Sequence, residues 1–188
     1  VITHDLARAG FKRTRRGCYV RLEGERIDVI WCQKHSTKPT CCINLGVHYS
    51  FVPKVGSTEF PVADHIEQTE CELKMRLTDA PEKKDQWWPL DENSVQAIGA
   101  LIVSKVSRIF QQYSLQGELG NIKVDDFASE VPELLKPMTR VRAVLLLARV
   151  YDHKDQDTLM IDLARFGLKI AGAAVGPKVA FNEMLKRR

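Results

Sequence analysis

Residues 41–50 alternate between two kinds of side chain, and this run constrains the fold more than any other part of the sequence. The odd-numbered positions from Cys41 to Tyr49 are apolar, whereas the even-numbered positions include Asn44 and His48. A period of two residues is that of a β-strand, in which successive side chains point to opposite faces. The run therefore predicts a half-buried strand whose odd-numbered side chains lie in a hydrophobic core.

Alternation also predicts three further strands, at residues 18–23, 26–33 and 70–77. The connection 23–25 is short enough for a hairpin, and only loops separate the other strands, which is typical of an antiparallel sheet. We expect a short helix that ends at Gly10 before the sheet, and a basic turn over residues 12–16 between the helix and the first strand.

From Asp91 onward the apolar period lengthens to that of an α-helix. Asp91 is a candidate N-cap, and one apolar face runs to a helix end near Leu115 through Val95, Ile98, Ile102, Ile109 and Tyr113. Shorter helices are expected at 137–151, 158–166, 168–176 and from Pro177 onward. The pattern predicts an α+β fold, with an antiparallel sheet of about four or five strands packed with a long helix, then a C-terminal bundle of short helices. We expect a sheet domain over residues 1–120 and a helical extension over 121–188.

Composition limits the class of protein. A chain of 188 residues that is 44% apolar can bury a core without disulfides or metals. Its five cysteines are an odd number, which favours a reducing cytoplasm over a secreted disulfide framework. We expect no contact with a membrane. The longest nearly apolar run, 143–150, is shorter than the roughly 20 residues that span a bilayer, and the start of the sequence lacks a signal-peptide pattern. The net charge of +4 does not by itself indicate nucleic acid.

Cys32, His35, Cys41, Cys42 and His48 supply the ligand types that Zn²⁺ binds, and Cys32-x-x-His35 has a metal-like spacing. Alternation places Cys41 and Cys42 on opposite faces, so the two cannot reach one ion from a regular strand. Cys42 and His48 share a face but lie roughly 20 Å apart along it, too far for a nucleophile and its base. We therefore expect the cysteines to pack in the core, and the sequence indicates no catalytic residue, cofactor or metal site.

Two segments are candidates for contact with a partner. The densest charge run contains Lys12, Arg13, Arg15 and Arg16. Its cations suit phosphate contacts, but a solvated turn between helix and strand is the favoured explanation because few aromatic residues flank it. The pair Trp87 and Trp88 precedes the long helix. Such a pair either anchors an interface or folds back to cap the core.

Five short motifs follow one another in the first part of the chain: Gly10-Phe11-Lys12-Arg13, Trp31 with Gln33, Asn44-Leu45-Gly46-Val47, Cys71 with Arg76-Leu77, and Trp87-Trp88-Pro89-Leu90. In this order they resemble a bacterial family of domains of unknown function, the one numbered 4304, over roughly residues 1–120. The resemblance implies a bacterial cytosolic protein built on a sheet with helices, and it brings no established activity. Small domains of this kind often accompany bacterial toxins as neutralising partners. This implied role rests on how often such domains and toxins occur together, and it says nothing of a mechanism.

The leading interpretation is a non-enzymatic protein-binding domain, and in its narrower form an immunity protein or antitoxin that neutralises a toxin by occlusion. The candidate binding surface combines one polar sheet face with the tryptophan pair: Tyr19, Arg21, Asn44, His48, Glu72, Lys74, Arg76, Trp87 and Trp88. The acidic stretch 125–133 is a second candidate. Full burial of His48 and Lys74 would remove the polar face as a contact surface. Two alternatives remain, a nucleic-acid-associated accessory protein that uses residues 12–16 and an unrecognised hydrolase.

Overall fold

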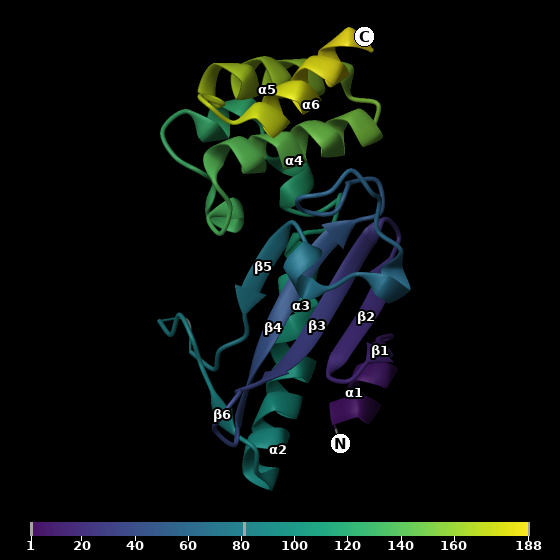
Figure 1. The fold of residues 1–188 in the computed structure, drawn as a ribbon, viewed down its shortest axis with the longest axis vertical. Helices are drawn as coiled ribbons and strands as arrows, with labels where there is room; N and C mark the ends of the chain where they lie inside the picture. The colour runs from purple at the N-terminus through teal and green to yellow at the C-terminus, as the bar shows by residue number, and fades with distance from the viewer. Residues whose placement is uncertain (1, 81, 188) are drawn as a thin grey trace. The chain divides into compact units, whose positions relative to one another are not determined.

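The computed structural model describes residues 2–80 and 82–187, and the chain divides into two compact units between Gln111 and Gln112. The first unit is an α+β structure and the second is built from helices and short turns (Figure 1). The α+β fold with C-terminal helices is therefore confirmed. The division lies ahead of the boundary expected at residue 120, within the last turn of a helix.

The sheet of the first unit is antiparallel throughout, and its first five strands have the same order in space as in the chain. These strands are β1 (Lys12–Arg15), β2 (Cys18–Glu23), β3 (Arg26–Lys34), β4 (Thr40–Tyr49) and β5 (Leu73–Arg76). A short sixth strand, β6 (Trp88–Pro89), pairs with the start of β4. Four strands were predicted. The other two, β1 and β6, lie where the sequence indicated a basic turn and a loop.

The register of the strands determines which side chains share a face of the sheet. Ile30 lies opposite Leu45, whereas Trp31 lies opposite Asn44, which in turn lies opposite Arg76. Because neighbouring rows point to opposite sides, Leu45 and Asn44 belong to different faces. We name the side of Leu45 the helix face, because Arg21, which points to that side, lies near the ring of Phe110 in the helix at 107–112. The side of Asn44 is the outer face, and Figure 1 shows the helices at 92–101 and 107–112 behind the sheet.

The helices of the first unit begin and end at clear sequence signals. They are α1 (Ile2–Arg8), α2 (Glu92–Leu101) and α3 (Ser107–Gln112). Gly10, with a φ of +83°, ends α1 as predicted: its N–H bonds the Ala7 carbonyl, and the N–H of Phe11 bonds the Leu6 carbonyl. Asp91 caps α2, because its carboxylate accepts a hydrogen bond from the Ser94 N–H at 2.8 Å.

A π-helical turn, η3 (Ile102–Val106), joins α2 to α3, so the long predicted helix is continuous but irregular. Along the whole helical segment, the buried side chains recur every four residues: Ile98, Ile102, Val106 and Phe110. In a regular α-helix that interval drifts by about 40° at each step. The π turn accommodates one extra residue and removes most of the drift. Phe110 is therefore buried, whereas Ile109, which the regular period had placed on the apolar face, is only half-buried.

Residues 62–71 cover part of the outer face and include two 3₁₀ turns, η1 (Ala63–His65) and η2 (Gln68–Glu70). They close a buried cluster that consists of Cys18, Val20, Ile27, Val29, Ile66 and Cys71. The close approach to β4 requires Gly46, because a Cβ there would lie 2.7 Å from the Cys71 sulfur. β4 is therefore covered on both faces and buried along almost its whole length, so the prediction of a half-buried strand is wrong.

The second unit packs three helices together: α4 (Arg140–His153), α5 (Asp157–Ile170) and α6 (Val175–Lys186). Three 3₁₀ turns precede them, η4 (Leu119–Asn121), η5 (Val124–Phe127) and η6 (Glu133–Leu135). The Tyr151 hydroxyl fastens this turn segment to α4, because it donates to the Ile122 carbonyl at 2.7 Å. Among the described residues, no helix is long and apolar enough to cross a membrane.

One helix, α5, replaces the two that the sequence predicted on either side of Gly167. The predicted break does not occur because Gly167 is a contact point between helices: a Cβ there would lie 2.2 Å from the ring of Phe181, which is fully buried. The start of α4 also differs from the prediction, since the helix begins at Arg140 and not at Pro137.

We expect Gly167→Ala to destabilise the second unit by about 1–2 kcal/mol, because overpacking against Phe181 exceeds the helix-propensity gain of about 1 kcal/mol. The matched control is Gly176→Ala in α6, where an added Cβ meets no atom within 4 Å and only the gain remains. Urea unfolding followed by far-ultraviolet circular dichroism measures both. All three tryptophans lie in the first unit, so an unchanged tryptophan-fluorescence transition would show that the effect is local. Equal stability of the two variants would contradict the prediction.

Candidate functional site

The buried carboxylate of Asp28 holds two arginines on the helix face. Nε and Nη2 of Arg21 donate to Asp28 Oδ2 at 3.0 and 2.7 Å, and Nε of Arg26 donates to Asp28 Oδ1 at 2.7 Å. Asp28 is fully buried and Arg26 is 3% exposed. Burial alone would lower the pKa of Arg26, but the hydrogen bond and the charge of Asp28 outweigh it, so this pKa is raised above its usual value.

Arg21 joins the same carboxylate to the helices. Its Nη1 donates to the Ala9 carbonyl at 3.1 Å, and its guanidinium lies 4.7 Å from the ring centre of Phe11 and 5.8 Å from that of Phe110. These contacts connect the end of α1, strands β2 and β3, and α3. The network around Asp28 is therefore a structural element of the first unit.

Tyr19 and Arg21 lie on the helix face, and not on the polar outer face to which the sequence interpretation assigned them. Tyr19 is opposite Ile30, and Arg21 is opposite Asp28, so both point toward the helices. The Tyr19 side chain is buried, and its hydroxyl lies 3.0 Å from the hydroxyl of Thr3. Alternation within a strand correctly separates its two faces, but the register decides which faces of different strands coincide.

His48 lies on the outer face but is completely buried. Its Nε2 lies 2.9 Å from the Val52 carbonyl, and its Nδ1 accepts a hydrogen bond from the Glu72 N–H at 3.2 Å. Both bonds suit a neutral ring with the proton on Nε2. His48 is thus a structural residue that a partner cannot reach. Lys74 is half-buried and donates to the Thr69 carbonyl at 2.5 Å.

Three of the candidate surface residues come together at one end of the outer face with two that the sequence interpretation missed. We name the five the aromatic–arginine patch: Trp31, Gln33, Asn44, Arg76 and Trp87. Trp31, Asn44 and Arg76 form one row across β3, β4 and β5, and the Arg76 guanidinium lies 5.5 Å from the ring centre of Trp87. Asn44 donates to the side-chain oxygen of Gln33 at 3.1 Å. Asn44 is buried and the other four are half-buried, so the patch is both ordered and accessible.

Loop residues hold Arg76 and Trp87 in position. One oxygen of Asp85 lies 3.2 Å from Arg76 Nη1, and the other accepts a hydrogen bond from the Trp87 ring N–H at 3.1 Å. The ring of His35 meets that of Trp87 edge-on, with the centres 5.0 Å apart. Trp88, in β6, is buried and pairs with Cys41 of β4. The two readings of the tryptophan pair therefore apply to different residues, since Trp88 fills the core and Trp87 reaches the surface.

The basic residues 12–16 follow the edge strand β1 and the turn after it. Arg15 forms an ion pair with Glu67 and thereby lowers the pKa of that carboxyl group. Lys12, Arg13 and Arg16 are exposed, and within residues 2–80 and 82–187 they form no ion pair. We name these three the basic ridge.

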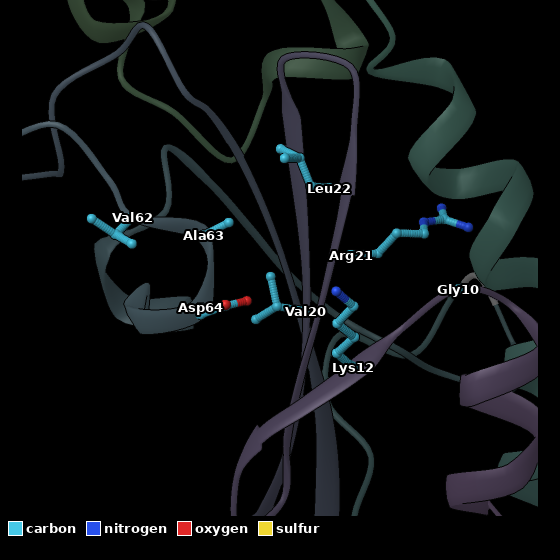
Figure 2. A pocket seen from close by; sticks show the side chains of 8 residues that line it. All are labelled: Gly10, Lys12, Val20, Arg21, Leu22, Val62, Ala63 and Asp64. Atoms are coloured by element: carbon cyan, nitrogen blue, oxygen red, sulfur yellow. The ribbon is translucent and has the colours of Figure 1, made fainter.

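A groove of about 330 Å³ opens beside the basic ridge, between β2 and η1. Figure 2 shows Val62, Ala63 and Asp64 on one side of Val20 and Leu22, whereas Arg21 extends away toward the helices. Leu22 is 58% exposed and Val62 is 62% exposed, so both offer apolar surface to solvent beside the groove. The full lining consists of Gly10, Lys12, Val20, Arg21, Leu22, Val62, Ala63 and Asp64.

The five cysteines are free thiols, and all but Cys32 are buried. Burial raises the pKa of Cys41 to about 12 and also raises that of Cys71. Thiols of this kind are weak nucleophiles, because the thiolate is the reactive form. Within the part of the chain that the structure describes, no group of three or more His, Cys, Asp or Glu side chains is placed to hold a metal ion.

We expect Asp28→Asn to destabilise the first unit by about 3–5 kcal/mol, because it takes the buried carboxylate away from the buried Arg26 and the half-buried Arg21 and leaves them only the exposed Glu23. The matched control is Glu23→Gln, which removes the partly exposed carboxylate next to Arg26 and should cost less than about 1 kcal/mol. Urea unfolding followed by tryptophan fluorescence reports on this unit. A loss below 1 kcal/mol for Asp28→Asn would contradict the structural role of the network.

We also expect iodoacetamide to modify native Cys32 first and to leave Cys41 and Cys71 nearly untouched at about pH 8. A thiol with a pKa of about 12 is ionised there to only about one part in 10⁴. Mass-spectrometric peptide mapping measures the rates, and denatured protein, in which all five thiols should react, is the control. Modification of Cys41 as fast as of Cys32 would contradict the packing described for β4.

Comparison with known proteins agrees with the resemblance noted in the sequence. No curated protein and no solved structure matches the chain. A family model described as "Domain of unknown function (DUF4304)" matches residues 2–112, which include the whole sheet and nearly all of the first unit. This match spans more than half of the 188 residues, and the chain therefore belongs to the DUF4304 family.

Proposed function

We propose that this chain is a non-enzymatic protein-binding domain and that the aromatic–arginine patch is its principal contact surface. The observation that carries the proposal is the grouping of two half-buried tryptophans and an arginine on one stretch of the outer face. Tryptophan and arginine are the residues most enriched among the few that dominate binding energy at protein interfaces. Gln33 adds a polar group that suits the rim of such a surface, and the buried Asn44 holds it through a hydrogen bond.

The contacts within the patch favour tight binding. Arg76 is stacked on Trp87 and paired with Asp85, and Trp87 is fixed further by His35, so these side chains are ordered before a partner arrives. A pre-ordered surface loses less conformational entropy on association than a mobile one. Each large ring also removes much apolar area from water when a partner covers it.

The narrower form of the proposal is that the partner is a toxin and that this chain is its immunity protein or antitoxin. Neutralisation by occlusion requires no chemistry from the inhibitor, only a rigid surface that covers the partner's active site. The ordered patch supplies such a surface. If the role is correct, one equivalent of the chain should abolish the partner's activity, and inhibition should weaken in parallel with affinity in the variants described next.

The test begins with capture of the partner from the native cells by the tagged full chain, followed by calorimetry on the purified pair. We expect Trp87→Ala to raise Kd at least about thirtyfold, as a loss of about 2 kcal/mol implies. Arg76→Lys keeps the charge but removes the planar stack, and should raise Kd about tenfold. The control is Val103→Ala, a change at a residue 66% exposed in the helical segment η3.

Circular dichroism and unfolding of each variant establish that the fold is retained before the affinities are compared. Values of Kd within twofold of the unaltered chain for both Trp87→Ala and Arg76→Lys would remove the patch as the contact surface. A loss of affinity in Val103→Ala alone would place the interface on the helical side of the unit.

A further inference from the structure

The groove between β2 and η1 is a second surface that the proposed function does not use. It lies at the β1–β2 edge of the sheet, whereas the aromatic–arginine patch spans β3 to β6. Its volume of about 330 Å³ is at the lower end of the range for ligand pockets, about 300–1,000 Å³. Leu22 and Val62 are 58% and 62% exposed, whereas Val20 and Ala63 in the same lining belong to the buried cluster or pack against it. Exposed apolar groups that gather at a concave site are typical of a binding surface.

Charge indicates what this groove would bind. Lys12 lines the groove on the outer face, opposite Val20, and Arg16 follows β1 in the next turn. Arg13 lies opposite Tyr19, so it projects from the same edge strand on the helix face. In the described residues these three cations have no acidic partner, in contrast to Arg15, which Glu67 neutralises. Unpaired cations that project from an edge strand, with Lys12 in the groove itself, are complementary to a segment with several carboxylates and one apolar side chain.

Two observations favour a protein segment over nucleic acid. The aromatic residues next to the ridge, Phe11 and Tyr19, are buried at 4% and 9% exposure, so they offer no platform on which bases could stack. Asp64 is exposed within the groove and would repel a phosphate chain that crossed it. An acidic protein segment can avoid that repulsion by placing its apolar residue near Asp64 and its carboxylates on the ridge.

The edge strand itself is unsuited to pairing with another strand. β1 is only four residues long, three of them are cationic, and its register with β2 shifts between Arg13 and Arg15. Short, charged and irregular edges are those that proteins protect against strand addition. The contact would therefore be made by side chains in the groove and on the ridge.

From these observations we propose that the groove and the basic ridge bind an acidic, extended segment of a protein partner, with one apolar side chain of that segment seated between Leu22 and Val62. The site is separate from the aromatic–arginine patch and does not rest on the function proposed above.

The test uses the full chain and a fluorescein-labelled probe peptide of about ten residues, made of glutamates with one central leucine. Fluorescence anisotropy at low salt should show binding that weakens as salt is added, because the ridge contributes charge. Replacing the central leucine of the probe with serine should raise Kd about tenfold, as expected for one buried aliphatic side chain. A peptide with lysines in place of the glutamates should not bind.

Variants of the chain locate the site. One double variant combines Leu22→Ser with Val62→Ser, and a second combines Lys12→Glu with Arg13→Glu. All four side chains are exposed, so the fold should stay intact, and each double variant should raise the Kd of the probe at least about tenfold. The matched controls Val175→Ser and Lys169→Glu, also at exposed positions, should not change it. Trp87→Ala should leave the affinity for the probe peptide unchanged even where it abolishes binding of the captured partner. A result that contradicts one of the two proposals therefore leaves the other unaffected.

Three results would overturn the proposal. The first is no anisotropy change at millimolar peptide, or equal binding of the leucine and serine probes. The second is that a short DNA duplex binds more tightly than the peptide and that the double variant Lys12→Glu with Arg13→Glu no longer binds the duplex. This result would assign the basic ridge to nucleic acid. The third is self-association of the chain that the Leu22→Ser with Val62→Ser change abolishes, which would assign the groove to a second copy.

Discussion

The pairing of Asp28 with Arg21 and Arg26 is the interaction on which the first unit depends. Two guanidinium groups are taken out of water here, and one carboxylate that is itself fully buried compensates for them. Because Arg21 and Asp28 lie directly opposite each other in β2 and β3, the ion pair also fixes the register of these strands. A shift by one residue would carry Arg21 to the outer face and leave Asp28 with Arg26 as its remaining arginine partner.

This arrangement divides the cations of the unit into two groups. Arg15, Arg21 and Arg26 are neutralised by Glu67, Asp28 and Glu23, so they contribute little field beyond the surface. The basic ridge keeps its full charge, and it lies at the opposite edge of the sheet from the stacked Arg76. The net charge of +4 conceals this division. What a partner encounters is a local distribution: an unpaired basic edge beside an apolar groove, and an ordered aromatic surface several strands away.

The sequence predicted the parts of the fold that obey a local period or a strong terminal signal. The alternation at residues 41–50 correctly predicts a strand, although this strand is buried on both faces and not on one. The stop at Gly10 and the cap at Asp91 have the expected structural role. The sequence pattern did not predict which residues of different strands pair with each other. Nothing local shows that Tyr19 aligns with Ile30 and Leu45, so the candidate polar face mixed two sides of the sheet. Trp31 and Gln33 were missed because only the pairing of β3 with β4 and β5 places them beside Arg76.

The helix that follows Asp91 illustrates a different limit and a consequence of its own. From Ile98 to Phe110 a regular α-helix would turn the apolar stripe by about 120°, whereas one π turn reduces this to about 20°. The extra residue thus keeps the apolar stripes of the two halves of the helix on the same side. A lineage that lost it would keep every side chain of the helix yet rotate the aromatic ring beneath Arg21 away from the sheet. Removal of one residue from this turn would therefore displace a whole half of the helix, whereas an exchange of one exposed side chain would alter only its own contacts.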